Sequence, residues 1–121
     1  MIKMDKPLGR IYISGKVSGC DWRETQAKFA VAANELLLAG IGPNDIFNPM
    51  DVGVIFPALE YEEYMKIDIA LLELCDAIYM LPDWKDSPGA KRELARAEEL
   101  GLTIIYAPEP EELQLKQKKH R

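Results

Sequence analysis

The sequence predicts an α/β fold in which helices cover both faces of a parallel sheet. Two observations support this prediction. Short β-branched and aromatic runs alternate with helical segments of about 15 residues, in the order β-α-β-α-β-α-β. The run AIYMLP (77–82) is continuously apolar, as expected for a strand buried on both faces. Right-handed crossovers then favour the strand order 2-1-3-4 in a Rossmann-like (flavodoxin-like) three-layer sandwich of four to five strands.

Four segments have the composition of strands. Besides 77–82, they are RIYISG (10–15), which ends in a Gly/Ser turn, DIFNP (45–49), which Pro49 stops, and LTIIYA (102–107).

Three segments have the periodicity of helices. The first, 21–40, begins at the N-cap candidate Asp21, and its helical spacing predicts a buried stripe of Ala27, Val31, Asn34 and Leu38, with Ala30 and Leu37 beside it. The second spans 60–74 and the third spans 87–100, where Gly101 stops it. The intervening segment 50–59 lacks periodicity and is expected to be an apolar loop that forms a lid or a wall.

The length and composition predict one soluble domain, residues 1–110, followed by a short helix or flexible tail at 111–121. Apolar runs are too short to span a membrane, and the N-terminus lacks the apolar region of a secretory signal, so a cytoplasmic location is expected. The net charge is −5 and the basic residues are scattered except in the tail KQKKHR, which argues against a nucleic-acid partner. Cys20 and Cys75 are expected to be free thiols, and the single histidine, His120, argues against histidine-based catalysis or metal binding.

A topological switch between the first and third strands is where a ligand is expected to bind. The two segments that meet there are SGKVSG (14–19) and PDWKDSPG (82–89). In the first segment, glycines allow close backbone approach and polar side chains can bind an anion. A plain strand-to-helix turn explains the glycines equally well. The residues concerned are Ser14, Gly15, Lys16, Ser18 and Gly19.

In the second segment, Ser87 and Pro88 suit a helix start and Gly89 leaves space for a ligand, so this helix end is a candidate phosphate site. Helix capping alone also explains Ser87 and Pro88.

Two carboxylates are predicted to approach this switch point. Glu93 borders the expected core stripe of the last helix, which consists of Ala90, Leu94, Ala97 and Gly101. An ion pair with Lys16, Lys91 or Arg96 is the alternative explanation for Glu93. Asp68 lies on the apolar side of helix 60–74, formed by Tyr61, Tyr64, Met65, Ile69, Leu71 and Leu72. Two carboxylates beside an anion site suit glycosyl transfer, in which one attacks the anomeric carbon and the other handles a proton.

Three motifs in this order resemble the nucleoside 2-deoxyribosyltransferase superfamily. They are YISGKVSG (12–19), D-x₇-D-A-I-Y (68–79) and SPGAKRELARA (87–97), and the similarity extends over residues 10–106. The resemblance is closest to the small 2′-deoxynucleoside 5′-monophosphate N-glycosidases and their phage and bacterial relatives. It implies that Glu93 is the nucleophile, that Asp68 assists departure of the base, and that Tyr12 orients Glu93. It also implies a 5′-end site made of Ser14, Gly15, Lys16, Gly19, Ser87 and Gly89.

The resemblance further implies a nucleoside or nucleoside 5′-monophosphate substrate, no metal or organic cofactor, and a homodimer or higher homo-oligomer.

The chain also departs from the family pattern. Lys91 and Ala95 stand where family members often carry glycine, and Lys16 replaces an arginine placed slightly later. The departures at Lys91 and Ala95 favour the alternative of a non-catalytic nucleotide sensor. The cytokinin-releasing phosphoribohydrolases have a similar architecture, but their PGGxGT run is missing. A third alternative is an interaction module that uses segment 50–59 with Trp22 or Trp84. In an active site, Trp84 could stack on a base, whereas Trp22 is expected to pack at a helix start. Asn48 and Asp83 either reach the pocket or cap turns.

Overall fold

The computed structural model describes residues 8–109 and has the predicted parallel sheet. Within these residues the sheet contains β1 (Ile11–Ser14), β2 (Ile46–Phe47), β3 (Ala77–Met80) and β4 (Thr103–Tyr106), in the order β2-β1-β3-β4. Each neighbouring pair is parallel; Ile11 is in register with Ile46 on one side and with Ala77 on the other. The prediction of fold class and strand order is therefore confirmed.

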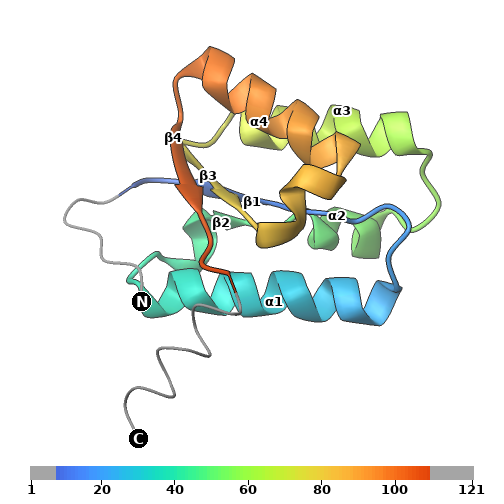
Figure 1. Cartoon of the computed structure of the whole chain (residues 1–121), viewed down its shortest axis with the longest axis horizontal. Helices are drawn as coiled ribbons and strands as arrows, with labels where there is room; N and C mark the ends of the chain where they lie inside the picture. The colour runs from blue at the N-terminus through green and yellow to red at the C-terminus, as the bar shows by residue number, and fades with distance from the viewer. Residues whose placement is uncertain (1–7, 110–121) are drawn as a thin grey trace, which may run out of the picture.

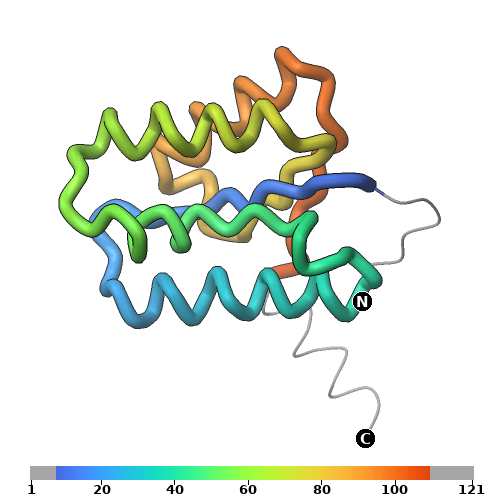
Figure 2. The backbone as a smooth tube through the Cα atoms, turned by 180° about the vertical axis from the view of Figure 1, so that it is seen from behind, coloured from blue at the N-terminus to red at the C-terminus, as the bar shows by residue number. Residues whose placement is uncertain are grey.

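Helices cover both faces of the sheet (Figures 1 and 2). Helix α1 (Trp22–Leu38) packs on one face, and α3 (Tyr61–Leu72) and α4 (Pro88–Leu100) lie together on the other. The strands alternate accordingly. Ile11, Ile13 and Tyr79 belong to the core cluster on the α1 face, whereas Tyr12 and Ile78 belong to the cluster that contains the α3 and α4 side chains.

The ends of α1 and α4 follow the sequence prediction. The Asp21 carboxylate accepts a hydrogen bond from the Glu24 N–H at 3.0 Å, and Ser87 Oγ accepts one from the Ala90 N–H at 3.0 Å. Helix α4 ends at Gly101, whose φ of 71° is a left-handed conformation that glycine adopts without a steric penalty. Gly101 itself is exposed, so it ends the helix and does not extend the core stripe.

The predicted buried stripe of α1 is wrong. Val31 and Leu38 are 59% and 68% exposed, and Ala27, Ala30, Asn34 and Leu37 are exposed as well. The residues that α1 buries are Thr25, Phe29, Ala32 and Leu36. Both stripes have helical spacing, and the bulk of Phe29 and Leu36 on the second determines which side faces the sheet.

Segment 50–59 also differs from its prediction as a loop, because α2 (Met50–Ile55) forms there. Asn48 Oδ1 accepts a hydrogen bond from the Met50 N–H at 3.0 Å, so Asn48 closes a turn just before this short helix, whose N-cap is Pro49. Two 3-10 turns, Pro43–Asp45 (η1) and Pro82–Asp86 (η2), were not predicted. The predicted tail at 111–121, including His120, lies outside the described residues.

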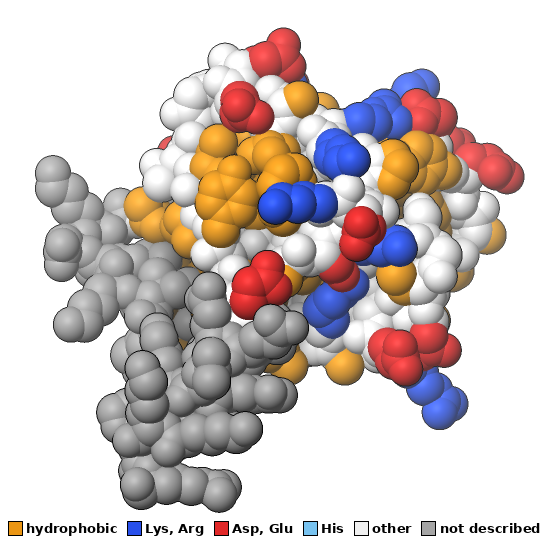
Figure 3. All heavy atoms as spheres, viewed as in Figure 1, with side chains coloured by type: hydrophobic (Ala, Val, Ile, Leu, Met, Phe, Trp, Pro, Cys, Tyr) orange, Lys and Arg blue, Asp and Glu red, His pale blue; other side chains and the backbone are white. Residues whose placement is uncertain are grey.

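Several further features concern the described residues only. Both cysteines are free, with Cys20 exposed and Cys75 buried. Between residues 8 and 109, no helix is long and apolar enough to cross a membrane. The face in Figure 3 carries acidic and basic side chains interspersed with apolar ones.

The corrected face of α1 can be tested by a pair of leucine substitutions. Leu36 is fully buried, so Leu36→Ala is expected to lower the free energy of unfolding by about 2–5 kcal/mol. Leu38→Ala removes an exposed side chain and is expected to change it by less than about 0.5 kcal/mol. Urea denaturation measures both; equal losses would contradict the assignment.

Candidate active site

The central feature of the site is a buried glutamate held by two hydroxyl groups. Glu93 on α4 is only 5% exposed. The Tyr12 hydroxyl donates a hydrogen bond to Oε2 at 2.5 Å, and the Ser14 hydroxyl donates one to Oε1 at 2.7 Å. Because Tyr12 and Ser14 are two residues apart on β1, their side chains point to the same face of the sheet, which is the face that α4 covers.

These contacts argue against the alternative that Glu93 is held by an ion pair. Within residues 8–109, Glu93 forms no ion pair, and Arg96 instead pairs with Glu73 at 2.7 Å. Hydroxyl donors satisfy the carboxylate without neutralising its charge. The Glu93 carboxylate thus lies at the pocket wall with two neutral hydrogen-bond donors.

Two opposing effects act on the acidity of Glu93. Burial raises the pKa of this carboxyl to about 7, although the hydrogen bonds from Tyr12 and Ser14 favour the ionised form and oppose the rise. Burial and the nearby carboxylates raise the pKa of Tyr12 well above its ordinary value, so Tyr12 remains a neutral hydrogen-bond donor.

Asp68 on α3 supplies the second carboxylate. Its Oδ1 atom is buried and has no hydrogen-bond partner among the residues that the structure describes. Burial, followed by the charge of Glu93, raises the pKa of Asp68 to about 7. Since Glu93 receives two hydrogen bonds and Asp68 Oδ1 receives none, ionisation is easier at Glu93, and a single shared proton belongs on Asp68.

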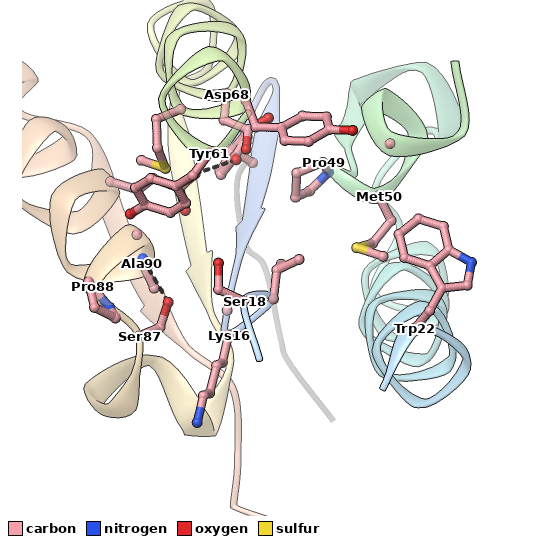
Figure 4. Close-up of a pocket in the computed structure, with 18 residues that line it drawn as sticks. Lys16, Ser18, Trp22, Pro49, Met50, Tyr61, Asp68, Ser87, Pro88 and Ala90 are labelled. Atoms are coloured by element: carbon pink, nitrogen blue, oxygen red, sulfur yellow. Dashed lines mark hydrogen bonds between the residues drawn. The ribbon is translucent and has the colours of Figure 1, made fainter. Parts of the chain in front are cut away.

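Both carboxylates line one pocket of about 510 Å³ at the carboxyl end of β1 (Figure 4). The β1–α1 turn, α2, α3 and the start of α4 enclose it. Most of its wall is apolar or aromatic, with polar groups at few positions, as in small-molecule sites. It is lined by Tyr12, Gly15, Lys16, Val17, Ser18, Trp22, Pro49, Met50, Gly53, Tyr61, Tyr64, Met65, Asp68, Ser87, Pro88, Gly89, Ala90 and Glu93.

The structure thus brings most of the predicted site residues together. Tyr12, Asp68 and Glu93 line the pocket, as do Gly15, Lys16, Ser87 and Gly89. Ser14 is not in the lining and contacts it through Glu93. Gly19 is outside the lining, and its φ of 78° accounts for glycine at that position.

Two of the three glycines in the lining, Gly15 and Gly89, also have packing roles. A Cβ atom on Gly15 would lie 2.8 Å from Leu81 Cδ1, and one on Gly89 would lie 3.3 Å from Tyr61 Oη and Met65 Sδ. Gly15 therefore lets the turn approach the residue after β3, and Gly89 lets α4 approach α3. The lack of a side chain at Gly15 and Gly89 thus shapes the pocket in two ways, by allowing close packing and by leaving open space.

The two tryptophans differ from their expected positions, because Trp22 lines the pocket and Trp84 does not. Trp22 lines the pocket opposite Tyr61 and is 48% exposed (Figure 4). Trp84 packs against the core beside α4, with its ring 6.0 Å from that of Tyr106, and does not line the pocket. The position of Trp22 directly after the N-cap Asp21 is the sequence feature that places it at the carboxyl end of β1.

Sequence reasoning also missed pocket residues on α2 and α3. Met50 and Gly53 belong to α2, which was expected to be a loop, and Tyr61 and Tyr64 were assigned to an apolar stripe. Tyr64 additionally donates a hydrogen bond to the Phe56 carbonyl, which fastens the segment between α2 and α3. Aromatic residues at the start of a helix that also carries Asp68 are the signal that could have identified this wall.

Within the described part of the chain, no cluster of three or more histidine, cysteine or acidic side chains has the arrangement of a metal site. The pocket holds two carboxylates with raised pKa values, Glu93 and Asp68.

The raised pKa of Asp68 predicts a pH-dependent gain in stability for Asp68→Asn. Because the folded-state pKa lies above the unfolded value, the stability associated with this group is fully present at acidic pH and is lost as the pH rises through about 7. Asp68→Asn is expected to raise the Tm at pH 8 by about 4 °C relative to wild type, and by less at pH 5. Calorimetry at both values, with the exposed Asp86→Asn as control, tests this. A Tm difference independent of pH would contradict it.

The chain was compared with known proteins. Residues 9–106 match the model of a family described as a domain of unknown function (DUF4406). No curated protein and no solved structure gives a significant match. Since the family model covers nearly the whole of the described region, the protein belongs to the DUF4406 family.

Proposed function

We propose that the protein cleaves the N-glycosidic bond of a nucleoside or nucleoside 5′-monophosphate, and passes the 2-deoxyribosyl group to water or to a second base. The observation that carries this proposal is the buried Glu93 carboxylate, held by Tyr12 and Ser14, in a pocket that also contains the unpaired Asp68 oxygen. The resemblance of the three sequence motifs to nucleoside 2-deoxyribosyltransferases supports the same chemistry.

The first step requires a nucleophile that keeps its orientation. A carboxylate oxygen of Glu93 attacks C1′ while the bond between C1′ and the base nitrogen breaks, and its electron pair leaves with the base. Tyr12 and Ser14 each bind one carboxylate oxygen, which fixes the plane of the group before the substrate enters. The product of this step is a glycosyl ester on Glu93 and a free base.

Departure of the base requires a proton. Asp68 is suited to supply it, because its pKa of about 7 leaves a substantial protonated fraction at neutral pH. In the second step, ionised Asp68 accepts a proton from water or from the incoming base, which then attacks C1′ and releases Glu93. Protons and electron pairs balance over the two steps without a cofactor.

The pocket wall suits a flat base and a small sugar. Trp22, Tyr61 and Tyr64 supply aromatic surface, and Met50 and Met65 supply adaptable apolar surface. Lys16, Ser18 and Ser87 are further polar residues of the lining and suit the 5′ end of the substrate. Trp22 replaces Trp84 as the candidate for stacking on the base.

The decisive substitution is Glu93→Gln, with Glu98→Gln as the matched control. Glu98 is exposed on the same helix. Wild type and the control are expected to release free base from at least one member of a panel of 2′-deoxynucleosides and their 5′-monophosphates, as measured by chromatography. Glu93→Gln is expected to lower that rate by roughly 10³-fold or more, because the amide is a poor nucleophile.

Two other outcomes of this experiment are informative, and one addition to it distinguishes the two reactions. Unchanged release by Glu93→Gln would overturn the proposed nucleophile. No release by wild type, with ligand-induced thermal stabilisation of both proteins, would favour the nucleotide sensor. Addition of a second base separates transfer from hydrolysis.

The two raised pKa values predict a bell-shaped pH profile. Activity needs Glu93 ionised and Asp68 protonated, and both groups have a pKa of about 7. We expect kcat/KM to be maximal near neutral pH and to fall about tenfold per pH unit on each distant limb. Asp68→Asn is expected to lower kcat roughly 100-fold and to remove the alkaline limb. An alkaline limb that persists in this variant would show that Asp68 is not the acid.

A further inference from the structure

A lysine and an aspartate outside the pocket join the β1–α1 turn to the segment after β3. Lys28 on α1 donates a hydrogen bond from Nζ to the Lys16 carbonyl at 2.7 Å and contacts Asp83 Oδ2 at 2.6 Å. The other carboxylate oxygen of Asp83, Oδ1, accepts a hydrogen bond from the Lys16 N–H at 3.0 Å. Lys28 and Asp83 therefore bind both backbone polar groups of Lys16, its N–H and its carbonyl.

This arrangement fixes a turn that the pocket depends on. Four consecutive residues of the turn, Gly15 to Ser18, line the pocket, whereas neither Lys28 nor Asp83 does. Of the two residues that the sequence placed at strand ends, Asn48 closes a local turn, but Asp83 reaches across to another segment. Lys28 and Asp83 are 55 residues apart in sequence, so the contact is a tertiary one.

The ion pair between Lys28 and Asp83 is suited to position the turn more than to stabilise the fold. The side chains of Lys28 and Asp83 are 30% and 31% exposed, and an ion pair with this exposure contributes little to the free energy of folding. The hydrogen bonds of Lys28 and Asp83 to the Lys16 backbone nevertheless restrict the orientation of the turn. A substrate that binds a fixed turn does not lose free energy in ordering it.

We propose that Lys28 and Asp83 are positioning residues that hold the turn 15–18 in the conformation that binds the polar end of the substrate. The inference rests on the proposed function, because it assigns the turn to substrate binding. It predicts an effect on KM with little effect on kcat, because the turn is assigned to the polar end of the substrate and not to C1′.

The test uses the full chain with Lys28→Met, Lys28→Arg and the control Lys66→Met, which removes an exposed lysine of α3. Two readouts are measured: hydrogen exchange of the Lys16 N–H by NMR, and steady-state base release. Lys28→Met is expected to speed the exchange and to raise KM, each by about fivefold or more, with kcat within about twofold of wild type. Lys28→Arg is expected to restore both values, since a guanidinium group can bind the same two oxygens.

Three results would contradict this proposal, and they can be distinguished from failure of the proposed function. Unchanged exchange of the Lys16 N–H in Lys28→Met would overturn the proposal, as would faster exchange with an unchanged KM. A fall in kcat with KM unchanged would also contradict it. If wild type releases no base from any substrate, the proposed function fails, and with it the assignment of the turn to substrate binding. The exchange rate then still shows whether Lys28 orders the turn.

Discussion

The burial of one carboxylate at the junction of the sheet and α4 is the constraint on which the site depends. A buried carboxylate without partners would be strongly destabilising, so the fold must supply hydrogen-bond donors for Glu93. Tyr12 and Ser14 do so from alternate positions of the central strand β1. The hydrogen bonds that offset the cost of burying Glu93 also fix its orientation and keep its charge available in the pocket.

The packing of α4 follows from this constraint. For Glu93 to reach β1, α4 must lie close to the sheet, and Ala90 and Ala97 are the small buried residues on that side. Gly89 brings the start of the helix close to Tyr61 and Met65 on α3. Since α3 carries Asp68, this close approach places the second carboxylate in the pocket that Glu93 lines. The shape and the electrostatics of the site therefore have a common structural origin.

The sequence predicted the fold and the carboxylates better than the pocket wall. The strands and the limits of α4 were predictable from local patterns, namely apolar runs, a capping serine and a terminal glycine, and the strand order followed from right-handed crossovers between them. The buried face of α1 was not, because two stripes share the helical period and only packing against the sheet distinguishes them. Trp22 and Lys28 were missed because their roles depend on tertiary contacts with α2 and with Asp83.

The most direct test of the central claim is detection of the covalent intermediate. A 2′-fluoro-2′-deoxyarabinosyl nucleoside slows glycosyl transfer, because fluorine destabilises the positive charge that develops at C1′. Incubation with this compound, followed by proteolysis and peptide mass spectrometry, should show the sugar mass on the peptide that contains Glu93. The adduct should be absent in Glu93→Gln and present in Glu98→Gln. Base release from this compound with no adduct on Glu93, or with the adduct on another residue, would contradict nucleophilic attack by Glu93.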